Sequence, residues 1–327
     1  MAEKKEQKGK KTVFITGMSG YVGSLLAREL DRAEWCERFW GMDVKTPLAK
    51  YKKGEFLRMD INDPALVTWV KELQPDILVH LAFVLNPIQD EKLMSHINID
   101  GSRNTLAAIE EAGIRKALIV SSATAYGAFA DNPVPLKESD PIRPHPHFSY
   151  ARDKAVVEGL CAEFAEKHPE IVMSIVRPVV IYGPHVDNYL SWLFLLPLGL
   201  LPSEHETHLQ FVHEDDVVGS ILHILDNDGR GPYNVAPADH MSMMDIHKLA
   251  GRSVIGLPDW VMMRLFGWTW KLKLPIAKVP ETFYDYVRYP WLVDNSRLAG
   301  ELGYKFQYST RETVEIMFRA KNVSIKG

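Results

Sequence analysis

The chain has 327 residues and a formal net charge of −4, with 46% hydrophobic and 24% charged residues. This composition is ordinary for a globular protein, and it excludes a disordered chain, a collagen-like repeat and a disulfide scaffold. The mild acidity argues against nucleic acid as a partner, which normally calls for a basic face. Cys36 and Cys161 are too far apart for a CxxC motif, so we expect free thiols in a reducing cytoplasm.

Targeting signals are absent from the sequence. Residues 1–11 are rich in Lys, Glu and Gln, and they predict a disordered tail rather than a signal peptide. The longest uncharged apolar run, Tyr189–Ser203, contains two prolines and is shorter than the roughly 20 residues that a membrane span needs. We therefore expect a cytoplasmic protein without a transmembrane segment.

From residue 12 onward, short apolar runs alternate with amphipathic stretches. Strands are expected at 12–16, 39–43, 56–61, 77–82, 117–121 and 171–176, and helices at 21–30, 64–73, 94–112 and 150–167. This alternation predicts an α/β fold, with a doubly wound parallel (Rossmann) sheet covered on both faces.

The regular alternation of predicted strands and helices ends after Arg177. The remaining signals are strands at 209–212 and 233–235, helices at 215–225 and 310–319, and a stretch at 257–275 that is rich in Trp, Met and Leu. We predict a first domain at 12–178 that holds the cofactor and the catalytic residues. Residues 179–327 would form mainly a smaller C-terminal α/β substrate domain, interleaved with the first.

A glycine-rich turn follows the first predicted strand. Gly17, Gly20 and Gly23 have a GxxGxxG spacing, between a strand and a helix. The first glycine permits the tight turn, the second lets a pyrophosphate approach the backbone, and the third lets the helix pack closely on the strand. The helix N-terminus then offers N–H groups to the phosphates. This context predicts a dinucleotide site.

Acidic residues end the second and third predicted strands. Asp43 lies 20 residues after Gly23, where a carboxylate can bind both ribose hydroxyls and repel a 2′-phosphate. It therefore predicts NAD rather than NADP, although Lys45 nearby could soften this preference. Asp60 and Ile61 are expected near the adenine.

Tyr150 and Lys154 lie one helical turn apart, so their side chains share one face. A lysine cation there should lower the pKa of the phenol. Ser122 follows a predicted strand at the carboxyl edge of the sheet, where its hydroxyl could bond a substrate oxygen. The pair alone is unspecific, and the strand-end serine strengthens the prediction.

Together these motifs resemble the extended short-chain dehydrogenase/reductase family, in its NAD-dependent epimerase/dehydratase branch of the UDP-glucose 4-epimerase type. The resemblance covers nearly the whole chain. It rests on Thr16–Gly23, His80–Ala82, Asn98–Gly101, Ser121–Gly127, Tyr150–Lys154, Arg177-Pro178, Tyr182–Pro184, Phe211–Val217 and Tyr233–Val235.

The resemblance implies a role for each matched residue. The catalytic set would be Ser122, Tyr150, Lys154 and Thr124. Contacts to NAD would come from Gly17, Ser19, Gly20, Tyr21, Val22, Gly23, Asp43, Asp60, Ile61, Leu81, Ala82, Asn98, Ser121, Tyr150, Lys154 and Pro178. It also implies a homodimer in which 94–112 and 150–167 form a four-helix bundle with their symmetry mates.

The sequence departs from the pattern of nucleotide-sugar enzymes at the positions that bind diphosphate. A second basic position of these enzymes aligns with Tyr284, where Arg288 could substitute. Val180 stands where UDP-sugar epimerases carry an Asn, and Leu209 stands where they carry an Arg. A diphosphate needs cationic or N–H donors, which these two side chains do not supply. Ala123-Thr124 replace the Asp-Glu of the dehydratases.

The substrate half is instead apolar. Residues 189–201 and 260–274 are rich in Leu and Trp and would frame an apolar cleft. Trp268, Trp270, Lys271 and Lys273 also suit a helix in peripheral contact with a membrane, although packing in a core or dimer explains them as well. Substrate contacts are expected at Phe83, Thr124, Val180, His185 and Leu209. The histidines do not have an HExxH spacing, so no metal is expected.

Our leading hypothesis is an NAD(H)-dependent oxidoreductase that interconverts a secondary alcohol and a ketone on a largely apolar, steroid-, lipid- or aromatic-like substrate. Tyr150 would take the proton as hydride leaves for NAD⁺. A nucleotide-sugar 4-epimerase with tightly bound NAD is the alternative. A catalytically silent NAD-sensing regulator is a third reading, which the intact Tyr150 and Lys154 disfavour.

Overall fold

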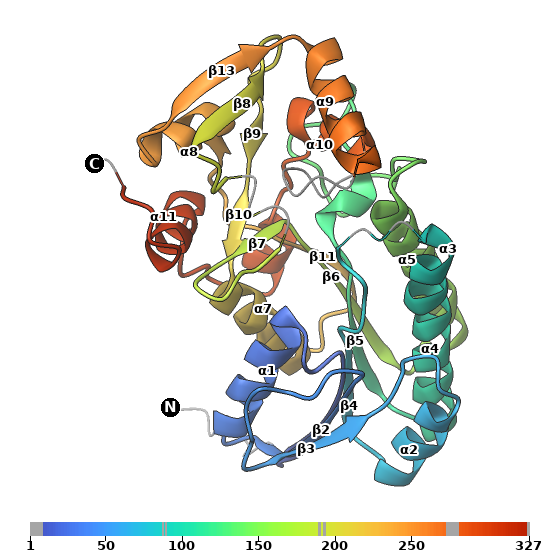
Figure 1. The fold of residues 1–327 in the computed structure, drawn as a ribbon. Helices are drawn as coiled ribbons and strands as arrows, with labels where there is room; N and C mark the ends of the chain where they lie inside the picture. Colours follow the sequence, from blue (N-terminus) through green and yellow to red (C-terminus); the bar gives the residue numbers. More distant parts are fainter. Residues whose placement is uncertain are drawn as a thin grey trace.

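Seven parallel strands form the central sheet, in the order β11-β6-β5-β4-β1-β2-β3 (Figure 1). The computed structural model describes residues 9–86, 88, 90–188, 191, 194–272 and 281–325. The strands are β1 (Lys11–Thr16), β2 (Cys36–Asp43), β3 (Gly54–Arg58), β4 (Ile77–His80), β5 (Lys116–Val120), β6 (Val172–Pro178) and β11 (Gly231–Val235). The chain order reverses between β1 and β4, and this switch point is where doubly wound sheets bind ligands. The predicted α/β fold is confirmed.

Helices cover both faces of this sheet because its central strands are apolar on both sides. All four residues of β4 are buried, for example. One face is covered by α1 (Tyr21–Arg32) and α7 (Glu214–Asp226), and the other by α2 (Ala65–Leu73), α4 (Gly101–Ala112) and α5 (Ser149–Lys167) (Figure 1). A separate hydrophobic core lies under each layer.

The helix predicted at 94–112 is interrupted in the structure. It consists of α3 (Glu91–Ser95), one π-helical turn, η1 (His96–Asp100), and α4. The π turn carries Asn98, whose buried side chain accepts a bond from Val84 N at 2.8 Å and donates one to Asp153 at 3.0 Å. Single π turns of this kind often mark functional sites.

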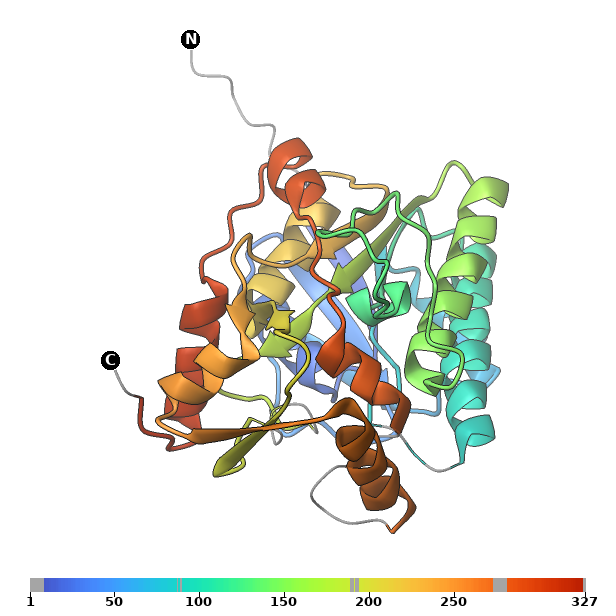
Figure 2. The same cartoon turned by 90° about the horizontal axis from the view of Figure 1, so that it is seen from above.

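A second group of elements, which we call the upper lobe, stands above the carboxyl edge of the sheet (Figures 1 and 2). It comprises β8 (Leu198–Pro202), β9 (His208–Leu209), β12 (Met241–Ser242), α8 (Met243–Leu249), β13 (Ser253–Leu257), α9 (Asp259–Lys271), η3 (Glu281–Tyr284) and α10 (Asp285–Arg288). The remaining elements are η2 (Ala123–Tyr126), the paired strands β7 (Val180–Tyr182) and β10 (Phe211–His213), η4 (Arg297–Glu301) beside β11, and α11 (Thr310–Ala320) beside β10.

The strand expected at 209–212 is split in two. Leu209 ends β9, which pairs with β12, and Phe211 begins β10, which pairs with β7. Gln210 lies between them, and its amide bonds to the carbonyls of Pro237 and Val293. The side chain of Gln210 thus binds backbone groups outside both strands, and the chain changes its pairing from β12 to β7 at this residue.

The strand at 233–235 is longer than expected and belongs to the central sheet, where β11 pairs with β6. The sheet therefore takes its last strand from the second half of the chain. The division at 178/179 stays a prediction. Of the predicted tail, residues 1–8 lie outside the described part of the chain, whereas Lys11 already begins β1. Within the described residues, no helix is both long and apolar enough to cross a membrane.

Candidate active site

The turn between β1 and α1 can hold only glycine at two of its three motif positions. Gly17 has a φ of +74°, and a Cβ atom on it would lie 2.5 Å from the backbone nitrogen of Ala82. A Cβ atom on Gly23 would lie 2.1 Å from the carbonyl oxygen of Gly17. Gly20 is the N-cap of α1 and supplies no side-chain cap. The first N–H groups of the helix therefore remain available to an anion.

Asp43 lies beside this turn. Its carboxylate accepts hydrogen bonds from the N–H groups of Ser19 and Lys45, each at 3.0 Å. These bonds fix the glycine loop to the end of β2. Asp60 caps its own turn by accepting from Asn62 N at 2.9 Å, whereas Ile61 is buried in the hydrophobic core under α2 and α4. The Ile61 side chain is therefore used for packing.

A cavity of about 190 Å³, which we call the central cavity, joins the glycine turn to the predicted catalytic residues. It is lined by Gly17, Gly20, Tyr21, Val22, Gly23, Leu81, Phe83, Leu85, Val120, Ser121, Ser122, Thr124, Tyr150, Lys154, Pro178, Val179, Val180, Ile181, Asn188 and Trp291. Six of these, which the sequence did not single out, are Leu85, Val120, Val179, Ile181, Asn188 and Trp291. Other predicted contacts lie outside this lining, namely Ser19, Asp43, Asp60, Ile61, Ala82, Asn98, His185 and Leu209.

Ser122, Thr124 and Tyr150 meet in the central cavity. The Ser122 oxygen accepts hydrogen bonds from the backbone N–H and the hydroxyl of Thr124, at 3.2 and 3.0 Å. Its own hydrogen is thus free to be donated, and Ser122 hydrogen-bonds to the Tyr150 phenol. Burial raises the pKa of Tyr150 to about 12, although the bond to Ser122 opposes this rise. The phenol is therefore protonated at neutral pH.

Lys154 is equally buried but points elsewhere. Its Nζ donates to the carbonyl of Val120 at 2.6 Å and lies 3.5 Å from the centre of the Phe83 ring. Burial lowers the pKa of Lys154 to about 7, and the negative charge of Glu158 partly opposes this. Lys154 is not among the groups that shift the pKa of Tyr150, and the expectation that it lowers this pKa stays a prediction. Desolvation is the largest cause of the pKa shifts of both Tyr150 and Lys154. The Phe83 ring contacts both side chains.

A buried ionic network supports this pair, and the sequence did not identify it. Glu158 lies one turn after Lys154 and pairs with Arg177, whose Nε and Nη2 atoms lie 2.6–3.1 Å from the carboxylate oxygens. Ser121 donates to the same carboxylate, and Arg177 also donates to the Tyr126 hydroxyl, each at 2.5 Å. The spacing of four residues between Tyr150, Lys154 and Glu158 was the available signal, since it places all three on one helix face.

His185 lies at the edge of the site rather than in the central cavity. Its ring bonds to Glu214 and is 56% exposed, and Glu214 also accepts a hydrogen bond from Tyr21 at 2.5 Å. Burial and the Glu214 charge hold the pKa of Tyr21 well above its usual value. This cluster joins the start of α1 to the start of α7, so His185 has a partner within the protein.

A second, smaller cavity, which we call the apolar cavity, adjoins the central one and shares Val180 and Trp291 with it. Its lining is aliphatic, aromatic or thioether: Val180, Tyr182, Phe194, Leu209, Phe211, Met243, Phe283, Tyr286, Val287 and Trp291. Tyr286 donates to the carbonyl of Thr124 at 2.7 Å, and Trp291 donates to the carbonyl of Tyr286 at 3.1 Å. Leu209 thus belongs to this wall, beyond Val180.

Cationic groups are scarce here. Among the described residues that line the two cavities, Lys154 is the only Lys or Arg. Arg288, the alternative phosphate anchor, pairs with Asp259 at 2.9 Å and Asp285 at 2.7 Å. Its charge is therefore already balanced within the upper lobe.

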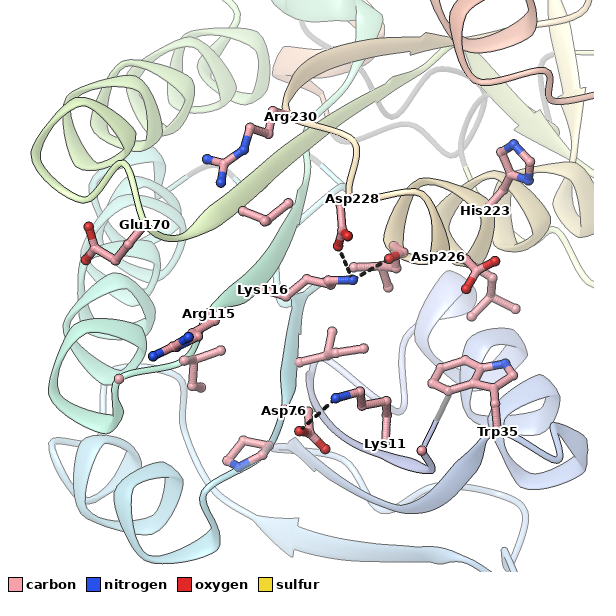
Figure 3. Close-up of a pocket in the computed structure, with 18 of the residues that line it drawn as sticks. Lys11, Trp35, Asp76, Arg115, Lys116, Glu170, His223, Asp226, Asp228 and Arg230 are labelled. Carbon is pink, nitrogen blue, oxygen red and sulfur yellow. Dashed lines mark hydrogen bonds and ion pairs between the residues drawn. The ribbon is translucent and has the colours of Figure 1, made fainter. Parts of the chain in front are cut away.

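A hollow of about 1190 Å³, larger than either cavity, lies at the opposite, amino-terminal edge of the sheet (Figure 3). Its charged side chains largely bind one another: Lys11 pairs with Asp76 at 3.5 Å, and Lys116 pairs with Asp228. Arg230 donates to the carbonyls of Pro169 and Ile171. None of the predicted catalytic residues lines this groove, so its size does not make it the reactive site.

Residues 13–236 match the model of the NAD dependent epimerase/dehydratase family. The chain belongs to this family. The predicted family branch is thereby confirmed, and the family's dependence on NAD confirms the predicted cofactor.

Relatives are similar along most of the chain. An uncharacterized protein of Mycobacterium tuberculosis is 23% identical over 96% of this chain and 85% of its own. The GDP-6-deoxy-D-mannose reductase of Pseudomonas aeruginosa is 26% identical over 72% of this chain and 78% of its own. The structure of the dTDP-glucose 4,6-dehydratase DesIV from Streptomyces venezuelae, with NAD and TYD bound, is 20% identical with a TM-score of 0.74, over 95% of this chain and 97% of that one. The two named enzymes act on nucleotide sugars, and neither supports the apolar substrate predicted from the sequence.

Proposed function

We propose that this chain catalyses NAD(H)-dependent hydride transfer that interconverts a secondary alcohol and a ketone. The observation that carries the proposal is the meeting of Ser122, Tyr150 and Lys154 in one buried cavity that also reaches the glycine turn. In doubly wound folds, ligands bind at this carboxyl edge of the sheet.

The residues present fit an NAD molecule. Gly17 and Gly23 allow the turn to pack closely, Gly20 at the N-cap of α1 leaves the backbone open to a pyrophosphate, and the half-buried Asp43 suits the adenine ribose. Lys154 and Tyr150 would contact the nicotinamide ribose, beside Leu81 and Pro178. The cofactor supplies or accepts the hydride, and the protein binds, orients and moves the proton.

The proton chemistry follows from the hydrogen bonds. Because Tyr150 is protonated at neutral pH, its phenol can give a proton to the oxygen of a ketone as hydride reaches the carbon. Ser122 can donate to the same oxygen, since Thr124 already satisfies its acceptor positions. In the oxidation direction Tyr150 must act as a base, and protonated Lys154 would lower the cost of forming the phenolate.

We further propose that the non-reacting part of the substrate is largely apolar. Val179, Val180, Ile181 and Trp291 line the central cavity, and the apolar cavity, of about 20 Å³, adjoins Val180 and Trp291. Burying such a ligand needs no charged anchor, whereas a diphosphate does. The absence of Asp-Glu after Ser122 disfavours a dehydratase.

A nucleotide-sugar reductase or 4-epimerase is the second candidate, favoured by the substrates named for the relatives. Its diphosphate would have to bind backbone N–H groups or residues outside the described ones. The expected homodimer through α4 and α5, which lie side by side in Figure 1, stays a prediction for which a solution mass is the test.

The decisive experiment compares the wild-type chain with Tyr150→Phe and, as a control, Tyr51→Phe, which lies before β3 and outside the cavity. With NAD and a panel of steroid-like, lipid-like and aromatic alcohols, we expect Tyr150→Phe to lose about 10²–10⁴-fold in turnover. Stabilisation by NAD should be unchanged in Tyr51→Phe, and Tyr150→Phe, which keeps the ring and loses only the hydroxyl contact to the ribose, should still be stabilised by NAD. Equal turnover of Tyr150→Phe and wild type would refute the mechanism.

Ligand-induced thermal shifts separate the substrate classes. Stabilisation by UDP-glucose but not by apolar alcohols would refute the apolar substrate, and sugar conversion without release of NADH would identify the epimerase. Binding of NAD without turnover of either class would favour the silent sensor.

A further inference from the structure

Exposed apolar side chains gather at the top of the upper lobe. Half of the twelve large hydrophobic residues that are exposed in the described chain lie on β8, α8, β13 and α9 or directly after α9. They are Leu198, Met244, Ile255, Trp260, Trp268 and Leu272. These elements lie together at the end of the molecule farthest from α2 (Figures 1 and 2). A concentration of exposed apolar groups of this kind marks an interaction surface.

The helix α9 carries the main part of this surface. Trp260, Arg264, Trp268 and Leu272 are spaced four residues apart, and so lie along one stripe, with Lys271 beside them. Trp260, Trp268 and Leu272 are 61%, 65% and 67% exposed. The opposite face, which includes Met262 and Phe266, is buried in the lobe. We call this stripe the α9 face.

The α9 face carries two cations of its own, and the exposed Glu281 carboxylate packs against Gly267 of the same helix. The two cations are Arg264 and Lys271, and all exposed residues of α9 are either cationic or tryptophan. Arg264 stacks on Trp260 at 5.3 Å. The acidic residue of the helix, Asp259, lies away from this stripe and is held by Arg288 and Tyr284. Exposed tryptophans flanked by cations are the features that seat a helix at the interface of an anionic bilayer.

The expectation from the sequence is corrected in detail. The structure half-buries Trp270, which was expected at the interface, and exposes Trp260 instead. Lys273 lies outside the described residues.

Apolar cavities lie between the α9 face and the catalytic residues. A third cavity, under α9, is lined by Leu265, Phe266 and Thr269 of that helix and by residues of β8 and α8. It shares Met243 and Val287 with the apolar cavity, which in turn shares Val180 and Trp291 with the central cavity. His247 in its wall adds no charge at neutral pH, because burial lowers the pKa of His247 to about 4. These two spaces, of about 50 and 20 Å³, are separated from each other and from the central cavity by the side chains that they share, so entry of a substrate from this side requires those side chains to move.

We propose that the α9 face docks on the surface of an anionic phospholipid bilayer and that an apolar substrate reaches the central cavity from that side. The docking step stands independently of the proposed function, whereas delivery of the substrate rests on it. A bilayer fits better than a second copy of this chain, because two α9 faces would bring Arg264 and Lys271 against their own like charges.

The test is flotation of the full chain with vesicles of phosphatidylcholine, with and without phosphatidylglycerol. We expect binding to the anionic vesicles only. The double variant Trp260→Ala/Trp268→Ala should bind at least about tenfold more weakly. The double variant Arg264→Gln/Lys271→Gln should lose roughly fivefold per cation. Trp69→Ala and Lys71→Gln, both on α2, are the matched controls and should bind like the wild type.

Folding and self-association are measured on the same samples. Stabilisation by NAD should be equal in every variant, since none of these residues lines the central cavity. Absence of wild-type flotation, or equal flotation of the tryptophan and control variants, would overturn the docking proposal. A loss of oligomeric mass without a change in flotation would assign the α9 face to a copy of the chain instead. Vesicle binding by a chain that turns over no apolar alcohol would retain docking and refute delivery.

Discussion

Neutralising Glu158 should destabilise the fold strongly, although this residue lies outside the cavity lining. Glu158→Gln keeps the size of the side chain and removes its charge. Arg177 is 5% exposed, and three of its hydrogen-bond contacts, at 2.6–3.1 Å, go to the Glu158 carboxylate. Leaving a buried charge without its partner costs about 3–5 kcal/mol of unfolding free energy.

Urea unfolding followed by tryptophan fluorescence measures this loss. With a slope of about 3 kcal/mol/M, the midpoint should fall by roughly 1–1.7 M. Glu111→Gln is the matched control, because its pair with Lys71 is 57% exposed on both sides and should contribute at most about 1 kcal/mol. The double variant Glu158→Leu/Arg177→Met removes both charges and should be more stable than the single variant. A midpoint for Glu158→Gln equal to that of Glu111→Gln would refute this reasoning.

The same substitution reports on Lys154. The Glu158 charge opposes the effect of burial, so its removal should lower the pKa of Lys154 below its present value of about 7. If protonated Lys154 helps to hold the cofactor, NAD affinity falls as the pH rises through this pKa, and the fall should begin at a lower pH in Glu158→Gln. If NAD affinity depends on pH in the same way in both proteins, the charge of Glu158 does not affect the pKa of Lys154.

Three further predictions use other parts of the site. Gly23→Ala should abolish NAD binding or the fold, since its Cβ would lie 2.1 Å from the Gly17 oxygen; normal NAD titration would contradict the close packing. Asp43→Ala should weaken discrimination against NADP by about tenfold or more in a binding assay, because it removes a like charge. His80 is buried, with its pKa lowered to about 3, so the folded state binds a proton less readily than the unfolded state. Stability should therefore fall by roughly 1.4 kcal/mol per pH unit as the pH drops below about 6.5, and His80→Gln should lack this slope in acid titrations of unfolding.

The parts of the site that the sequence predicted are those encoded locally. The glycine spacing between 17 and 23 and the four-residue step from Tyr150 to Lys154 follow from the geometry of one turn and one helix. The alternation of strands and helices likewise determined the sheet, since parallel strands must be joined by crossovers. Each of these signals lies within about 30 residues.

What the sequence missed depends on segments that are far apart. The partners of Arg177 come from α5, η2 and the loop that carries Glu138. From the sequence alone, a charged residue at the end of a strand is expected to be exposed, because these distant partners cannot be identified. The pairing of β8 with β13 joins residues about 55 positions apart, so the local pattern of apolar residues could not predict it. Trp291 enters the cavity wall from the last tenth or so of the chain for the same reason.

Burial, which only the assembled fold determines, also sets the chemistry of the pair. Desolvation disfavours charge on either group, so it moves the phenol of Tyr150 up to about 12 and the amine of Lys154 down to about 7. Burial thus prepares the tyrosine to act as an acid rather than as a base. Oxidation of an alcohol needs a positive charge nearby to stabilise the phenolate, and the oxidised nicotinamide ring or a protonated Lys154 would supply it. Burial of the pair therefore favours proton donation, and the positive ring of the oxidised cofactor would favour the reverse direction.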